Sequence, residues 1–336
     1  MGFEKARDSM PALQTGKLLP TDMVGGAGIV TQGNIFFVKP YSGSDANDGM
    51  SPDTALKTLK GALAKATANQ NDIVYLMSES NTGSATTDYQ SVALDWNKDG
   101  VHLIGANNGA MIGSRSRIAQ LSSVKSLTNL LTVSANNCLI ANIEVYQGVA
   151  SSTALAPQAL IVTGSRNRFV NCQISGIGDA SLDVTGARSV YITGSENSFQ
   201  HCYLGLDAII RATAEVEVEI LGTSGAPVAR TIFEDCTINS WTSLSTFKGL
   251  KTTYIDRFVQ LRNCIISAAQ NVGASVAPTG AIINVTPNGT VNMLNGGVFG
   301  YANISTATDA KLLVLANWGL PTNSNKPGIA IGQQTT

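Results

Sequence analysis

The sequence predicts an all-β protein, a single-stranded right-handed parallel β-helix whose chain winds into a solenoid. The main observation is a repeat: residues 163–174 and 193–204 share the pattern Thr-Gly-Ser-x-Asn-x-Phe-x-x-Cys. Weaker copies continue in both directions, with steps of 29, 30, 34 and 28 residues between the equivalent positions Ile143, Cys172, Cys202, Cys236 and Cys264. A nearly constant period of this length indicates stacked coils with small loop insertions.

The composition fits one elongated body better than two compact domains. Only 13% of the 336 residues are charged, and the formal net charge is -1. With 43% hydrophobic residues the chain is not intrinsically disordered. It has no basic excess, so neither nucleic acid nor an anionic membrane is expected as a partner. The charged opening residues 1–8 lack the apolar run of a secretory leader, which predicts synthesis in a cytoplasm.

The repeat divides the chain into four parts. We expect an extended N-terminal arm over 1–34, a cap over 35–78, the β-helix over 79–300 and a C-terminal capping or assembly segment over 301–336. The arm mixes Pro, Gly and charge without periodicity, so it is either a disordered leader or a segment that orders against a neighbouring subunit. In the C-terminal part, residues 311–315 and 328–331 predict strands outside the repeat.

A short helix is predicted to close the N-terminal end of the solenoid. Thr58 is a suitable N-cap, and apolar residues from Leu59 to Ala66 fall on one helix face. Around it, Gly-Ser-Asp-x-Asn-Asp-Gly (43–49), Thr-Leu-x-x-Ala (58–62) and Asp-Ile-Val-Tyr (72–75) follow in order. In these motifs the chain resembles the N-terminal cap of pectate-lyase-like right-handed parallel β-helix proteins, a group that includes bacterial polysaccharide lyases and many phage particle proteins. The resemblance implies that the helix plugs the first coil.

Two columns of side chains are predicted along the repeat. The four cysteines at one repeat position are expected to be reduced, inward-pointing thiols: Cys172, Cys202, Cys236 and Cys264. Cys138 aligns with Asn167 and is expected to face elsewhere. The second column is a ladder of stacked amides from Asn142, Asn171 and Asn263, in which His201 is a hydrogen-bonded substitute.

The best candidate catalytic group combines acids from successive coils. Asp179 and Asp207 follow Cys172 and Cys202 by seven and five residues, with Asp183 and Arg211 nearby. Two carboxylates one coil apart could perform glycosidase chemistry. Solvated loop acids are the alternative interpretation. Glu215, Glu217 and Glu219 alternate, which predicts that all three lie on the solvent face of one strand.

No cofactor or metal is expected. The segment 44–49 suggests a calcium loop, but its Gly is misplaced for an EF-hand and no Glu follows, so a turn is favoured. The cysteines lie whole coils apart, unlike zinc ligands. Gly164 and Gly194 precede no helix, so they are interpreted as corner residues rather than as a phosphate-binding loop.

The resemblance to phage-type β-helix proteins implies a virion context. The favoured interpretation is a virion structural protein made in the host cytoplasm, a capsid decoration or cement protein that binds the major capsid protein and copies of itself as a homotrimer. Two alternatives stay open: a tailspike-like polysaccharide depolymerase (a lyase or glycoside hydrolase) and a receptor-binding tail protein. Whether the chain is an enzyme is left open, with binding favoured because charge is sparse and no clear catalytic constellation is visible.

Overall fold

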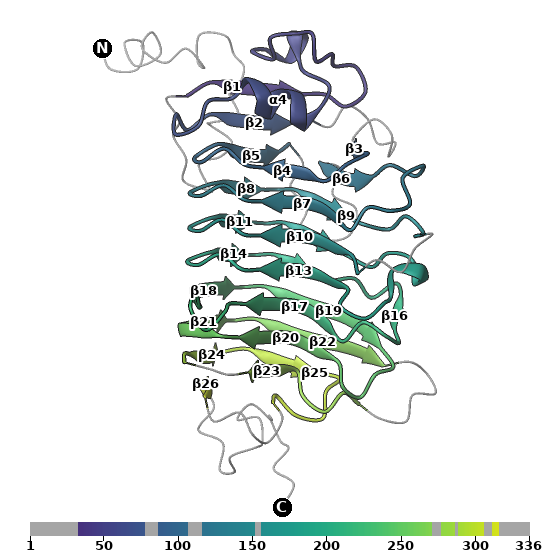
Figure 1. Cartoon of the computed structure of the whole chain (residues 1–336), viewed down its shortest axis with the longest axis vertical. Coiled ribbons are helices and arrows are strands. Elements are labelled where there is room, and N and C mark those ends of the chain that lie inside the picture. Colours follow the sequence, from purple (N-terminus) through teal and green to yellow (C-terminus); the bar gives the residue numbers. More distant parts are fainter. Residues whose placement is uncertain are drawn as a thin grey trace, which may run out of the picture.

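The computed structural model is a parallel β-solenoid of about seven turns with very little helix, which confirms the predicted fold class (Figure 1). The structure describes residues 33–77, 87–106, 116–151, 156–270, 277–285, 288–305 and 311–315. Residues 1–32 of the predicted N-terminal arm (1–34) and residues 328–331 lie outside this range, so the expectations about them stay predictions.

Three parallel sheets form the walls of the solenoid. Sheet A contains β1 (Ile35–Val38), β2 (Ile73–Leu76), β5 (His102–Gly105), β8 (Leu139–Ala141), β11 (Arg168–Val170), β14 (Ser198–Gln200), β18 (Val228–Glu234), β21 (Ile255–Arg262), β24 (Thr290–Leu294) and β26 (Leu312–Leu315). Sheet B contains β3 (Thr87–Gln90), β6 (Arg117–Gln120), β9 (Glu144–Tyr146), β12 (Gln173–Ser175), β15 (Tyr203–Leu204), β16 (Ile210–Arg211), β19 (Thr237–Thr242), β22 (Ile265–Gln270) and β25 (Gly297–Phe299). Sheet C contains β4 (Leu94–Trp96), β7 (Asn129–Val133), β10 (Gln158–Val162), β13 (Arg188–Ile192), β17 (Val216–Leu221), β20 (Lys248–Thr253) and β23 (Ile282–Val285).

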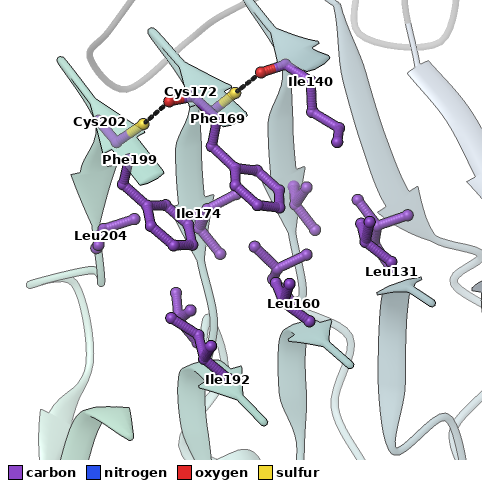
Figure 2. Packing of buried hydrophobic residues seen from close by; sticks show 14 of the residues in the cluster. Leu131, Ile140, Leu160, Phe169, Cys172, Ile174, Ile192, Phe199, Cys202 and Leu204 are labelled. Carbon is purple, nitrogen blue, oxygen red and sulfur yellow. Dashed lines mark hydrogen bonds between the residues drawn. The ribbon is translucent and has the colours of Figure 1, made fainter. Parts of the chain in front are cut away.

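Equivalent residues of successive coils stack directly in the core. Phe199 pairs in register with Phe169 on one side and Phe233 on the other. The ring centroids are 4.5 Å and 5.1 Å apart with nearly parallel planes. All three rings are fully buried, and Figure 2 shows aliphatic side chains from the other two sheets packed against the rings of Phe169 and Phe199. The core is therefore a set of side-chain columns along the solenoid axis.

The cysteine column is confirmed, since all five cysteines are free and buried. Each thiol of the column donates to a backbone carbonyl of the preceding coil, for example Cys172 Sγ to Ile140 O at 3.4 Å and Cys202 Sγ to Phe169 O at 3.6 Å (Figure 2). Cys138 lies outside this column, as expected, but its side chain is also buried in the core.

The corners between sheets C and A require glycine. A Cβ added to Gly194 would lie 1.8 Å from the carbonyl oxygen of Gly164, and a Cβ on Gly164 would lie equally close to Ala135 O. Beside these glycines, Asn167 Oδ1 accepts a hydrogen bond from Cys138 N, and Asn197 Oδ1 accepts one from Asn167 N, both at 2.9 Å. The Thr-Gly-Ser-x-Asn motif thus brings one corner directly onto the next, as the sequence interpretation of Gly164 and Gly194 proposed.

The corners between sheets A and B hold the predicted asparagine column. The main cause of this column is the backbone conformation at the corner and not hydrogen bonding between the side chains. Its members all adopt the left-handed backbone conformation, with φ between 51° and 57°: Asn142, Asn171, His201, Asp235, Asn263 and Asn295. Asn tolerates this conformation better than most residues do. Side-chain bonds join only some neighbours, such as Asn171 Nδ2 to Asn142 Oδ1 at 2.8 Å. His201 is exposed, with Nδ1 3.8 Å from the Asp235 carboxylate, so the ladder is not continuous.

Helix α4 (Leu59–Lys65) closes the N-terminal end, as predicted. Thr58 Oγ1 accepts from Gly61 N at 2.9 Å, and the buried Asp88 carboxylate of β3 accepts from Leu59 N at 2.9 Å. The apolar face of α4 joins the main core. At the other end, β26 pairs with β24 and extends sheet A, so the expectation that residues 311–315 lie outside the repeat was wrong. The described ranges also contain two short 3-10 helices, η2 (Pro52–Thr54) and η4 (Ala180–Leu182).

Within the described ranges no helix is long and apolar enough to span a membrane.

Candidate functional site

Two of the predicted catalytic acids organise loops. Asp179 is the N-cap of η4, and its Oδ1 accepts from the backbone N and hydroxyl of Ser181 at 2.9 Å and 2.7 Å. These hydrogen bonds lower the pKa of Asp179. The Asp183 carboxylate accepts three backbone N–H bonds, from residues 212, 213 and 214, at 2.7–3.0 Å. The Asp179 carboxylate therefore bonds its own loop, and the Asp183 carboxylate bonds the corresponding loop of the next coil.

Asp207, the second acid of the predicted pair with Asp179, is exposed. Successive coils place equivalent strand residues together, but these acids lie in the connections between sheets B and C, where coil lengths differ.

Arg211 is fully buried, so the expectation that it lies on an accessible catalytic face was wrong. Its guanidinium donates to Ile209 O at 2.8 Å and Leu206 O at 3.0 Å, and lies 3.5 Å from Glu217 Oε2. Bonds of 3.4–3.5 Å reach the carbonyls of Gly176 and Ile177 on the preceding coil. Arg211 therefore joins two loops to sheet C.

Glu217 is also fully buried, and Glu219 nearly so, which corrects the prediction that both lie on a solvent face. Glu219 stands in register with the half-exposed Tyr191 and Lys251, whereas Glu217 stands in the same column as Ala159, which belongs to the core. Glu217 accepts from the Ser189 hydroxyl on β13 and faces Arg211. Burial raises the pKa of Glu217, and Arg211 opposes that shift.

A second charged group, which we call the basic cluster, lies on the outer face of sheet C: Arg188, Tyr191, Glu219 and Lys251. Tyr191, Glu219 and Lys251 stand in register on β13, β17 and β20. Lys251 Nζ lies 3.0 Å from Glu219 Oε1, and Arg188 pairs with the other carboxylate oxygen. The Arg188 guanidinium also lies over the Tyr191 ring, 4.5 Å from its centroid.

The basic cluster has two cations around one carboxylate, so a net positive charge remains for an anionic ligand. Desolvation lowers the pKa of Arg188. The sequence interpretation missed this cluster. Combining the period-two alternation of β17 with the step from Glu219 to Lys251 would have placed these two residues side by side.

The outer face of sheet B, unlike the basic cluster on sheet C, carries little charge. We call it the B face and define it by two rows of outward residues: Arg117, Glu144, Gln173, Tyr203, Thr237, Ile265 and Gly297, and Tyr89, Ala119, Tyr146, Ser175, Asn239, Ser267 and Phe299. The residues between the rows, such as Val145 and Ile174, belong to the core. The only charged residues in the rows are Arg117 and Glu144, which pair with each other at 2.7 Å.

The suggested calcium loop is a turn. Asp45 Oδ1 accepts from the backbone N of Lys57 and Thr58 at 2.9 Å, and Asp48 accepts from Met50 N and the Thr54 hydroxyl. Among the described residues no group of His, Cys, Asp and Glu side chains is arranged to hold a metal ion.

No protein-family model matches the sequence, and no curated protein is significantly similar to it. Solved structures share the fold. Pectin methylesterase PemA from Erwinia chrysanthemi is 14% identical with a TM-score of 0.53, over 89% of this chain and 93% of that one. Pectate lyase Pel9A is 14% identical with a TM-score of 0.51, over 87% and 81%.

The tailspike protein gp49 from Acinetobacter baumannii bacteriophage Fri1, a capsular polysaccharide depolymerase, matches with a TM-score of 0.38 and 11% identity, over 72% of this chain and 41% of that one. The structural neighbours are thus pectate-lyase-like parallel β-helix proteins, among them polysaccharide-degrading enzymes and a phage tailspike.

Proposed function

We propose that this protein is a structural component of a phage particle, a capsid decoration protein that acts by binding. The observation that carries the proposal is the contrast between the loops that hold the candidate catalytic residues and the outer face of sheet B. The sequence's candidate catalytic groups Asp179, Asp183 and Arg211 hold loops in place. The B face, in contrast, is long, neutral and aromatic, which suits protein contacts. The capsid location comes from the resemblance of the cap to phage particle proteins.

The proposed partners are the major capsid protein and further copies of this chain, arranged as a homotrimer. The test is to image purified particles with a gold-labelled antibody against this protein. Many copies distributed over the shell are expected. A few copies at the tail alone would overturn the proposal.

The basic cluster favours a second candidate, a tailspike-like protein that acts on an acidic polysaccharide. Arg188 and Lys251 would bind sugar carboxylates, and Glu219 is the nearest carboxylate to them. Under this candidate the purified protein shortens such a polymer, and Glu219→Gln abolishes the cleavage while Asp207→Asn leaves it unchanged. The decoration proposal expects an unchanged polymer with all three proteins, measured by size-exclusion chromatography of the polysaccharide.

A further inference from the structure

We propose that the B face binds the B face of a second copy of this chain. The inference deepens the proposed function, because proteins arrayed on a shell contact their own copies. It concerns the purified protein, so its test is independent of where the protein lies in a particle.

Exposed apolar side chains are concentrated on and beside the B face. Tyr89, Ile265 and Phe299 are 45%, 42% and 61% exposed, and Val92 and Leu121, which follow β3 and β6, are 56% and 36% exposed. Together they are most of the large hydrophobic residues that the described chain exposes, the others being Tyr41 and Met50 in the cap. By strand order they fall into two patches: Tyr89, Val92 and Leu121 lie on or directly after the first strands of sheet B, and Ile265 and Phe299 lie on the last.

Between the patches, polar side chains of the B face bond one another. Gln173 Nε2 donates to Ser175 Oγ at 3.0 Å. Asn239 Nδ2 donates to the Tyr203 hydroxyl at 2.5 Å, and Ser267 Oγ donates to Asn239 Oδ1 at 2.6 Å. These donors are already engaged, so they offer little directed hydrogen bonding to a polysaccharide. A flat protein surface with apolar ends is the better occupant.

Charge favours an identical copy over a charged partner. Because Arg117 and Glu144 neutralise each other, two B faces meet without like-charge repulsion. The other two faces are less suited to self-contact, since sheet A carries Arg168, Glu234 and Arg262 and sheet C carries the basic cluster. Apolar patches at both ends also match when identical faces lie parallel to each other, the orientation that a homotrimer requires.

The area is that of a weak, reversible contact. The strand order from β3 to β25 spans eight strands, which at about 4.8 Å per spacing gives a length of about 34 Å. These strands contain two to six residues and are on average about 13 Å wide, so each copy contributes about 450 Å². Two copies therefore bury about 900 Å², which is in the range of transient protein contacts.

The experiment compares the purified full-length chain with Tyr89→Lys/Phe299→Lys by sedimentation velocity over a range of concentrations. Wild type is expected to self-associate, and the double variant to raise the dissociation constant by about 100-fold or more, since it places charge in both patches. Tyr41→Lys is the matched control: Tyr41 is 71% exposed but lies in the cap loop, so association should be unchanged.

A labelling measurement locates the contact. All five native thiols are buried, so a maleimide reagent reports on an introduced surface cysteine. Phe299→Cys should be protected at high protein concentration and reactive at low concentration, whereas Tyr41→Cys should react equally at both. A monomeric wild type, an unaffected double variant or concentration-independent labelling of Phe299→Cys would each overturn the proposal. If only added capsular polysaccharide protects Phe299→Cys, the occupant is a glycan and not a second copy.

Discussion

Phe199→Ala removes the middle ring of the three-ring stack and tests the core directly. Phe199 is fully buried and stacks on Phe169 and Phe233 with centroid distances of 4.5 Å and 5.1 Å. Replacing a buried Phe by Ala costs about 3–5 kcal/mol. Phe199 also forms two stacked ring pairs, each of which stabilises the fold by about 0.5–1.5 kcal/mol. The cost should therefore lie at the upper end of the range for Phe→Ala, and we expect the free energy of unfolding to fall by about 5 kcal/mol.

Equilibrium unfolding in guanidinium chloride, followed by circular dichroism, measures this loss as a shift of the midpoint at constant slope. Phe299→Ala is the matched control, because Phe299 is 61% exposed and should cost less than about 1 kcal/mol. Phe199→Leu fills part of the cavity and should cost less than half as much as Phe199→Ala. Equal losses for Phe199→Ala and Phe299→Ala would refute the stacked-column interpretation of the core.

Three further predictions follow from the corners, the cap and the thiols. Gly194→Ala should lower the unfolding free energy by more than about 2 kcal/mol, because its Cβ would lie 1.8 Å from a carbonyl oxygen; Gly225→Ala, with no atom within 4 Å of the new Cβ, should be nearly neutral in the same titration. Burial raises the pKa of Asp88 from 3.8 to about 6, so between these values the folded state binds more protons and the unfolding free energy falls as pH rises, by about 3 kcal/mol in total. Asp88→Asn should remove this dependence from midpoints measured between pH 4 and 7, and an unchanged slope would contradict the assignment. The buried thiols of the cysteine column should react with a maleimide only after denaturation: Cys172, Cys202, Cys236 and Cys264. Rapid labelling of these thiols in the native protein would contradict their burial.

The stacked core could be predicted from the sequence because every coil repeats the same environment. Phe169 and Phe199 occupy one position of the repeat, and parallel in-register strands then leave a single way to place them. Gly164 and Gly194 were predictable as corner residues for the same reason. The asparagine column was also predictable, but its main cause is backbone conformation, as the positive φ of His201 and Asp235 shows.

The candidate site could not be predicted in the same way. Alternation along the strand predicted that Glu217 faces solvent, but its side chain is fully buried. Alternation does not reveal which neighbours surround a side chain, and here Ser189 and Arg211 contact the Glu217 carboxylate. Likewise, the spacing of Asp179 and Asp207 from the cysteines measures position along the chain and does not show what each carboxylate bonds; Asp179 bonds Ser181 of its own loop.

The strand register shows where the longest step of the repeat has its extra residues. Phe199 follows Val190 by nine residues, whereas Phe233, its partner in the next coil, follows Val218 by fifteen. The extra length therefore lies at the corner between sheets C and A.

The connection from sheet B to sheet C is no longer in this coil than in the preceding one, yet it contains β16, which pairs with β19 and ends at Arg211. Burying Glu217 requires a buried cation, because an unpaired internal carboxylate is strongly destabilising. Arg211 meets that requirement and also bonds carbonyls of the preceding coil. The departure from the sequence prediction at Glu217 therefore comes from the path of this loop and not from its length.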